Sequence, residues 1–102
     1  MNLNKLLKEA QRMQKEVLRI QEELAKKKVE VTAGGGAVKV VVSGSQEPLE
    51  VKIQPDLLSA EEVEMLEDLI LAAFREALEK SKKLAEEELK KVQGGLGLPG
   101  LF

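Results

Sequence analysis

The chain of 102 residues has no cysteine, histidine, tryptophan or tyrosine, and its aromatic residues are two phenylalanines. Without cysteine and histidine it can form no disulfide, thiolate nucleophile, Cys/His zinc site or histidine acid–base catalyst. Only carboxylates, lysines and hydroxyls remain for catalysis, so an enzyme is the weakest class of function. We expect no cofactor, no metal site and no small-molecule substrate.

Long apolar runs are also missing. The N-terminal segment carries Lys5, Lys8 and Glu9, and no stretch is apolar enough to span a bilayer. We therefore expect a cytoplasmic protein without a membrane partner. Hydrophobic residues make up 43% of the chain, enough for the core of one domain. The net charge of −2 does not by itself indicate a nucleic-acid partner.

Residues 3–27 have the periodicity of one long helix. Their apolar side chains recur in alternating steps of three and four, which is the a/d seam of a coiled-coil heptad. Asn2 or Asn4 can cap the start, because asparagine accepts hydrogen bonds from free first-turn N–H groups. The seam consists of Leu3, Leu6, Ala10, Met13, Val17, Ile20 and Leu24.

Three short segments then alternate apolar and polar residues, as strands with one buried face do. They are residues 29–33, 38–42 and 49–53. Three glycines at residues 34–36 make the first connection, since glycine tolerates the positive φ of a tight turn. Residues 43–48 make the second. Connections this short predict an antiparallel meander.

A second long helix is predicted over residues 60–92. Ser59 and Glu62 have the spacing of a capping box, and acids precede bases along the helix, which suits the helix dipole. Residues 94–102 are rich in glycine and uncharged, so we expect a flexible tail there. The predicted fold class is α+β, with one domain over residues 1–93 in the order helix, three-stranded antiparallel sheet, helix.

The lengths of these elements favour a homodimer. Helices of 25 and 33 residues are about 37 and 50 Å long, whereas a strand of five residues spans about 17 Å. The apolar stripes of the helices must therefore continue past the sheet. They meet each other or a second chain.

The outer face of the first helix carries a row of cations. In the heptad register, Lys5, Arg12 and Arg19 occupy c positions and Lys8 and Lys15 occupy f positions, away from the seam. Residues 1–28 carry a net charge of +4 in an acidic chain. A cationic stripe of this kind can follow phosphates. The candidate DNA-binding residues are Lys5, Lys8, Arg12, Lys15 and Arg19, with Arg75, Lys82 and Lys83 of the second helix as secondary candidates.

A plainer interpretation is a solvated helix face with intrahelical ion pairs. Against it, Lys8 with Arg12 and Lys15 with Arg19 are like-charge pairs four residues apart. The scarcity of aromatics argues against stacking on single strands and favours the backbone of a duplex. The alternative from another class is a protein-binding coiled-coil adapter or chaperone of prefoldin-like layout, which grips partners by its seam or tail.

Several segments also carry a family likeness, and they cover nearly the whole chain in order. They are LLKEAQRMQK at residues 6–15, VEVT at 29–32, GAVKV at 36–40, PDLL at 55–58, MLEDLILAAF at 65–74, and LPG at 98–100 before Phe102. Together they resemble the YbaB/EbfC family of bacterial nucleoid-associated DNA-binding proteins.

The resemblance implies a small homodimer in the cytoplasm and nucleoid that binds double-stranded DNA. Its sheet region would join the protomers and its long helices would project as arms. A role in nucleoid organisation and gene regulation is implied as well. The family supplies no base-reading residue to transfer, so the assignment of DNA contacts rests on the cationic stripe alone.

Overall fold

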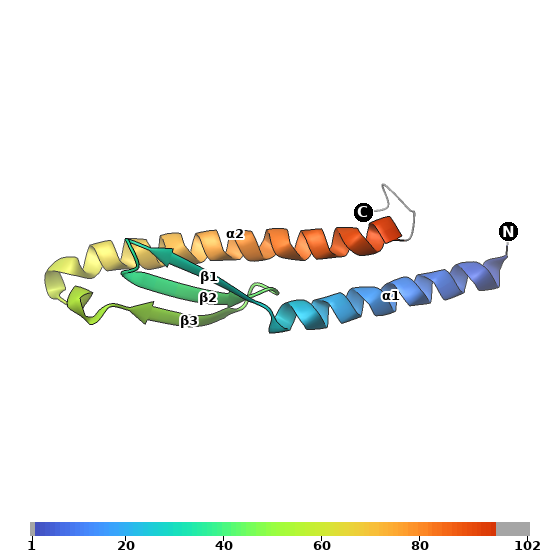
Figure 1. Ribbon diagram of the computed structural model, residues 1–102, viewed down its shortest axis with the longest axis horizontal. Helices are drawn as coiled ribbons and strands as arrows, with labels where there is room; N and C mark the ends of the chain where they lie inside the picture. The colour runs from blue at the N-terminus through green and yellow to red at the C-terminus, as the bar shows by residue number, and fades with distance from the viewer. Residues whose placement is uncertain (1, 96–102) are drawn as a thin grey trace.

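The computed structural model describes residues 2–95. The chain forms α1 (Leu3–Lys26), β1 (Lys28–Ala33), β2 (Val38–Ser43), β3 (Pro48–Ile53), two 3₁₀ turns (Pro55–Leu57 and Ala60–Glu62) and α2 (Val63–Gly95). The α+β class and the order of elements are confirmed. The molecule is a rod of 69 × 22 × 16 Å, with the sheet under one half of α2 and α1 beside the other half (Figure 1).

The first helix begins where asparagine capping predicts. The Asn2 side-chain oxygen accepts hydrogen bonds from the backbone N–H groups of Asn4 (3.1 Å) and Lys5 (3.4 Å), so Asn2 is the cap. The helix ends at Lys26, because Lys27 already has an extended backbone.

The sheet is an antiparallel meander in the order β1-β2-β3. The turn between β1 and β2 requires its glycines: Gly34, Gly35 and Gly36 all have positive φ (64°, 68° and 91°). A Cβ at Gly34 would also lie 2.9 Å from a methyl carbon of Leu69 on α2.

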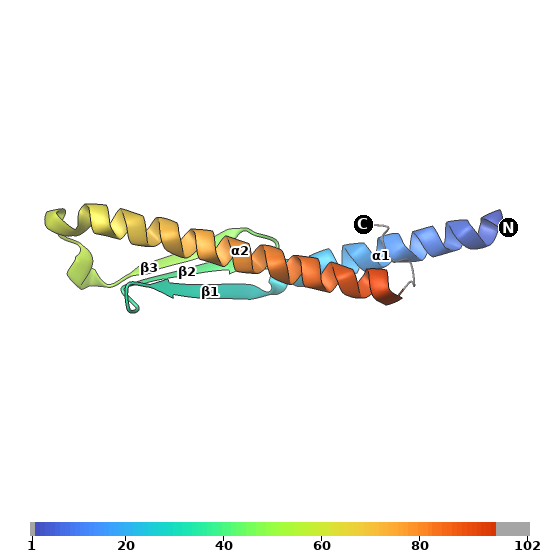
Figure 2. The same ribbon diagram turned by 90° about the horizontal axis from the view of Figure 1, so that it is seen from above.

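One face of the sheet packs on α2, and Figure 2 shows the helix running along it. The core consists of valines from β1 and β2 and two alanines of α2, whose small side chains let the helix approach closely. These residues are Val31, Val38, Val40, Val42, Ala73 and Ala77. Edge strand β3 contributes none of them, and its Leu49 and Val51 stay 49% and 43% exposed.

The predicted capping box at the start of the second helix is wrong. The Ser59 side chain makes no capping hydrogen bond; instead the Glu62 N–H donates to the backbone carbonyl of Ser59 (3.1 Å). That bond closes a 3₁₀ turn, and the α-helix begins only at Val63. A box needs its serine immediately before the first α-helical turn.

The far end of α2 also differs from the prediction, because the helix continues through Gly94 and Gly95, where a tail was expected. Glycine is tolerated in a last turn, since its cost of about 1 kcal/mol is small beside the hydrogen bonds already formed. The remainder of the predicted tail, residues 96–102, lies outside the described residues.

A compact junction fixes α1 against the sheet and α2. The Gly44 N–H donates to the Lys27 carbonyl (3.0 Å), and a Cβ at Gly44 would lie 2.5 Å from the carbonyl oxygen of Leu24. Beside it, the buried Ser81 hydroxyl donates to the Ser43 carbonyl (2.6 Å) and accepts from the N–H of Gln46 (3.3 Å).

Only the C-terminal half of the predicted seam is covered within the chain. Ile20 and Leu24 are buried between α1 and its neighbours at 5% and 3% exposure, whereas Leu3 and Leu6 are 67% and 54% exposed. The first turns of α1 project past the end of α2 in both views (Figures 1 and 2). Among the helices of residues 2–95, none combines the length and apolar run of a membrane span.

Candidate nucleic-acid interface

The five cations of the predicted stripe all lie on α1, and all five are exposed. Because α2 covers the seam at Ile20 and Leu24, the opposite side of α1, with Lys8 and Lys15, faces outward. Arg12 and Arg19 instead border the groove between α1 and α2. The structure thus brings Lys5, Lys8, Arg12, Lys15 and Arg19 together on one helix. The ion pairs of the helix separate them into two groups, the arginines and the lysines.

The two arginines are engaged with carboxylates of the same helix. Arg12 pairs with Glu9 (2.8 Å), and Arg19 pairs with both Glu16 (2.8 Å) and Glu23 (2.9 Å). The hydrogen bond from Arg19, followed by its charge, lowers the pKa of Glu16, and the same contacts raise the pKa of Arg19. For Arg12 and Arg19 the plainer interpretation, an ion-paired helix face, therefore describes the geometry.

The three lysines differ from the arginines. The ion pairs found within residues 2–95 do not include Lys5, Lys8 or Lys15. Each is an exposed ammonium on the projecting helix, so its charge is available to an anion without breaking an existing pair.

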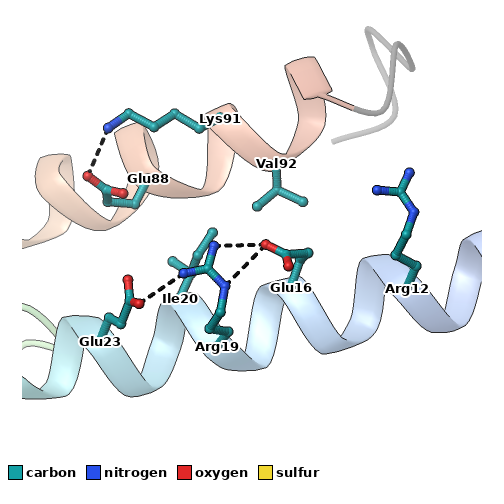
Figure 3. A pocket seen from close by; sticks show the side chains of 8 residues that line it. All are labelled: Arg12, Glu16, Arg19, Ile20, Glu23, Glu88, Lys91 and Val92. Atoms are coloured by element: carbon teal, nitrogen blue, oxygen red, sulfur yellow. Dashed lines mark hydrogen bonds and ion pairs between the residues drawn. The ribbon is translucent and has the colours of Figure 1, made fainter.

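A groove of about 280 Å³ separates α1 from α2, and Figure 3 shows its walls. Arg12, Glu16 and Arg19 line the α1 side, and Glu88, Lys91 and Val92 line the α2 side. The hydrogen bond from Lys91 (3.2 Å) lowers the pKa of Glu88; burial opposes this shift, and the charge of Lys27 adds to it. The groove is thus lined by charges of both signs.

Sequence reasoning left Lys91 out of the candidate site. The α1 heptads cannot show which bases of α2 lie beside α1. The signal was present in α2, because Lys91 continues the steps of three and four that connect Ala77, Ser81, Leu84 and Glu88.

The secondary candidates lie on other faces of α2. Arg75 and Lys82 are exposed, seven residues apart, on the side turned away from the core residues Ala73 and Ala77. Lys83 pairs with Glu79 one turn earlier (3.5 Å). None of the three lines the groove between the helices. Among residues 2–95, no group of three or more carboxylates is placed to hold a metal ion.

The fold and the charge distribution are those of a small elongated α+β protein that presents a cationic helical arm. The sequence profile of the YbaB/EbfC DNA-binding family matches residues 1–96. The chain belongs to this family, whose description is of DNA binding rather than of catalysis.

Relatives and a solved structure agree with this placement. A nucleoid-associated protein of Pelotomaculum thermopropionicum is 50% identical, over 99% of this chain and 96% of the relative. A nucleoid-associated protein of Acetivibrio thermocellus is 51% identical, over 99% and 90%. The crystal structure of the uncharacterized protein HP0035 from Helicobacter pylori superposes with a TM-score of 0.70 at 25% identity, covering 94% of this chain and 97% of that one.

Proposed function

We propose that the protein binds double-stranded DNA as a homodimer, mainly through phosphate contacts from the outer face of α1. The proposal rests on three exposed lysines, Lys5, Lys8 and Lys15, which form no ion pair with a carboxylate within the described chain. Phosphates need cations in reach and little else. The names of the relatives support a place in the nucleoid. The proposal extends to a cytoplasmic location and to a role in nucleoid organisation and gene regulation.

The arginines join the contact at a cost. A phosphate that binds Arg12 or Arg19 must displace a carboxylate that already satisfies part of the guanidinium. The lysines therefore make the first contacts, and the arginines follow as the duplex approaches.

The second chain of the dimer is expected at edge strand β3. This strand leaves its outer backbone N–H and C=O groups unpaired, and its apolar side chains are uncovered by α2. The connection to α2 and its first turns add the exposed Leu58, Val63 and Met65. An isologous contact of this surface with its copy would bury these side chains on both protomers.

The protein-binding adapter remains the second candidate because of the tip of α1. Leu3 and Leu6 belong to the first turns of the seam, and most of their surface is exposed. This end of α1 projects past the end of α2 (Figure 1). Such a stripe suits a partner helix. Suppression of the aggregation of an unfolded client, without retention on DNA, would favour this function over the first.

The deciding experiment compares two variants that each lose three positive charges. In the first, Lys5, Lys8 and Lys15 become Gln; in the control, Lys28, Lys39 and Lys52 of the sheet become Gln. Lys39 and Lys52 pair with Glu30 and Glu50, whereas Lys28 belongs to none of the ion pairs within residues 2–95. The control therefore removes the same charge but one free cation instead of three.

Affinity for a duplex is measured against salt concentration. For the parent we expect a slope of log affinity against log salt between about −3 and −8, and about −5 if all three lysines of both protomers engage. The α1 variant should lose most of this slope, and the sheet variant should keep it. Equal losses in the two variants would mean that net charge, not the α1 lysines, governs binding.

A further inference from the structure

The charged residues of α1 are restricted to three of the seven heptad positions, and the cationic stripe alone does not explain this restriction. All ten charged residues of Leu3–Lys26 fall at the c, f and g positions of the heptad, and the other four positions carry none. The a and d positions form the seam. The b and e positions form a second uncharged row, which we call the amide row: Asn4, Leu7, Gln11, Gln14, Leu18, Gln21 and Ala25.

The chain itself does not cover the amide row. All seven residues are exposed, although α2 buries the neighbouring seam at Ile20 and Leu24. The amide groups of Gln11 and Gln14 make no side-chain hydrogen bond within residues 2–95. Their donors and acceptors are free for a ligand. Gln21, by contrast, lines a hollow at the junction with Leu24 and Gly44.

The amide row lies next to the free lysines. At about 100° per residue, Gln11 lies within about 60° of both Lys8, three residues before it, and Lys15, four residues after it. These three side chains form one outward ridge. A duplex whose phosphates reach Lys8 and Lys15 would therefore bring its interior toward Gln11.

Carboxamides are suited to reading adenine. A glutamine or asparagine pairs with adenine N6–H and N7 in the major groove, and apolar side chains contact the thymine methyl group. The major groove, about 12 Å wide, admits an α-helix, whereas the minor groove, about 6 Å wide, does not. Leu7 and Leu18 in the same row supply the apolar contacts.

We propose that α1 enters the major groove with its amide row toward the base edges, where Gln11, aided by Gln14, favours A·T pairs. This inference rests on the proposed duplex binding and adds base readout to it. The alternative occupant, a second protein chain on the amide row, is an outcome of the test.

The test compares parent protein with the double variant Gln11→Ala/Gln14→Ala on A·T-rich and G·C-rich duplexes of equal length. The parent should favour the A·T-rich duplex about tenfold, within the range of one bidentate contact. The double variant should bind both duplexes nearly equally, with an unchanged salt slope because no cation is lost. The control Gln21→Ala removes a carboxamide from the part of the amide row that lies at the junction with the sheet. This variant should keep the preference for the A·T-rich duplex.

A chemical probe separates base reading from groove shape. A·T tracts also attract cations through a narrow minor groove. Replacing adenine by 7-deazaadenine removes N7 from the major groove only, so it should abolish the preference of the parent. Survival of the preference on the 7-deazaadenine duplex, or in the double variant, would overturn the inference in favour of groove width.

The remaining outcomes are equally decisive. A parent that binds both duplexes equally well overturns base reading while leaving phosphate binding in place. A double variant that loses self-association instead of A·T preference assigns the amide row to a second chain. A parent that binds neither duplex removes the proposed function, and this inference with it.

Discussion

The ion pairs of Arg19 show how single side chains would limit the DNA affinity proposed for α1. Its guanidinium bridges Glu16 and Glu23, one turn away on either side, and all three side chains are about half exposed. Exposed pairs of this kind contribute little to folding stability. Their effect on binding is larger, because each carboxylate holds a cation that a phosphate would otherwise use and repels that phosphate as well.

Removing these carboxylates should strengthen DNA binding. In the variant Glu16→Gln/Glu23→Gln, Arg19 keeps its charge and loses both partners, so one more phosphate contact becomes available. We expect affinity to rise roughly threefold to tenfold and the salt slope to steepen by about 0.9 for each protomer, hence by about 1.8 for the dimer. Titration on a duplex measures both quantities. The control Glu61→Gln/Glu62→Gln removes the same charge before the first turn of α2, and an equal gain there would show that only net charge matters.

The same contacts define a pH dependence. Because Arg19 lowers the pKa of Glu16 in the folded protein, the pair contributes stability above the ordinary glutamate pKa and loses it as the pH falls through the lowered value. NMR titration of the Glu16 carboxyl should therefore give a pKa below the usual value of 4.5, and Arg19→Gln should raise that pKa.

The junction of α1, the sheet and α2 depends on one buried hydroxyl. Ser81 of α2 bonds the Ser43 carbonyl at the end of β2 and the N–H and side-chain amide of Gln46 in the following turn. Gln46 has a φ of 64°, a left-handed conformation that these bonds help to hold. Elements far apart in the sequence are tied here by hydrogen bonds to one atom.

Ser81→Ala should destabilise the fold by about 1–3 kcal/mol, because it removes the hydroxyl that donates to the Ser43 carbonyl and accepts from the backbone and side-chain N–H groups of Gln46. The Ser43 carbonyl and the Gln46 N–H then keep only the 3.1 Å hydrogen bond to each other. Urea unfolding followed by circular dichroism measures the change. Ser59→Ala is the matched control and should change stability by less than about 0.5 kcal/mol, since that hydroxyl caps no helix. A larger cost at Ser59 would indicate that the capping box forms after all.

The elements themselves could be predicted from the sequence because each has a local cause. The period of α1, the alternation of the strands and the glycines at residues 34–36 act within a few residues. Contacts between elements could not be predicted. How much of the α1 seam is covered depends on where Gly44 seats the helix, and the seam pattern is the same at Leu6 and at Ile20.

The site was predictable in part for the same reason. The heptad register placed the five cations of the stripe on one helix. It also placed Glu9, Glu16 and Glu23 three or four residues from Arg12 or Arg19, so intrahelical ion pairs were a predictable alternative. The structure shows that the arginines form these pairs and that the three lysines do not. Lys91 was missed because the sequence of neither helix shows which of its residues face the other helix.

At the scale of the whole molecule, the rod has more apolar surface than one chain can bury. Val51 lies opposite the buried Val40 on the face toward α2, yet it is 43% exposed because α2 covers only β1 and β2. An aspartate in this position would leave the single chain intact and place an unpaired charge in the proposed dimer contact.

Val51→Asp should therefore convert a dimer into a folded monomer. Light scattering should give twice 11.2 kDa for the parent and 11.2 kDa for the variant, with little change in circular dichroism. Thr32→Asp, at an exposed position on the opposite face of the sheet, should leave the dimer intact. A parent mass of one chain would exclude the homodimer. DNA affinity should fall with Val51→Asp, because two arms bind more tightly than one.

The seating of α1 on Gly44 has a mechanical consequence. With 24 residues, α1 is about 36 Å long, and it is fixed near its C-terminal end by the contact between Gly44 and Leu24. The tip at Leu3 lies about 32 Å from Leu24, so a tilt of about 10° at this contact moves the tip by about 5.5 Å, the rise of one helical turn. In the proposed complex, a small change in packing around Gly44 would therefore shift the tip of α1 along the DNA backbone.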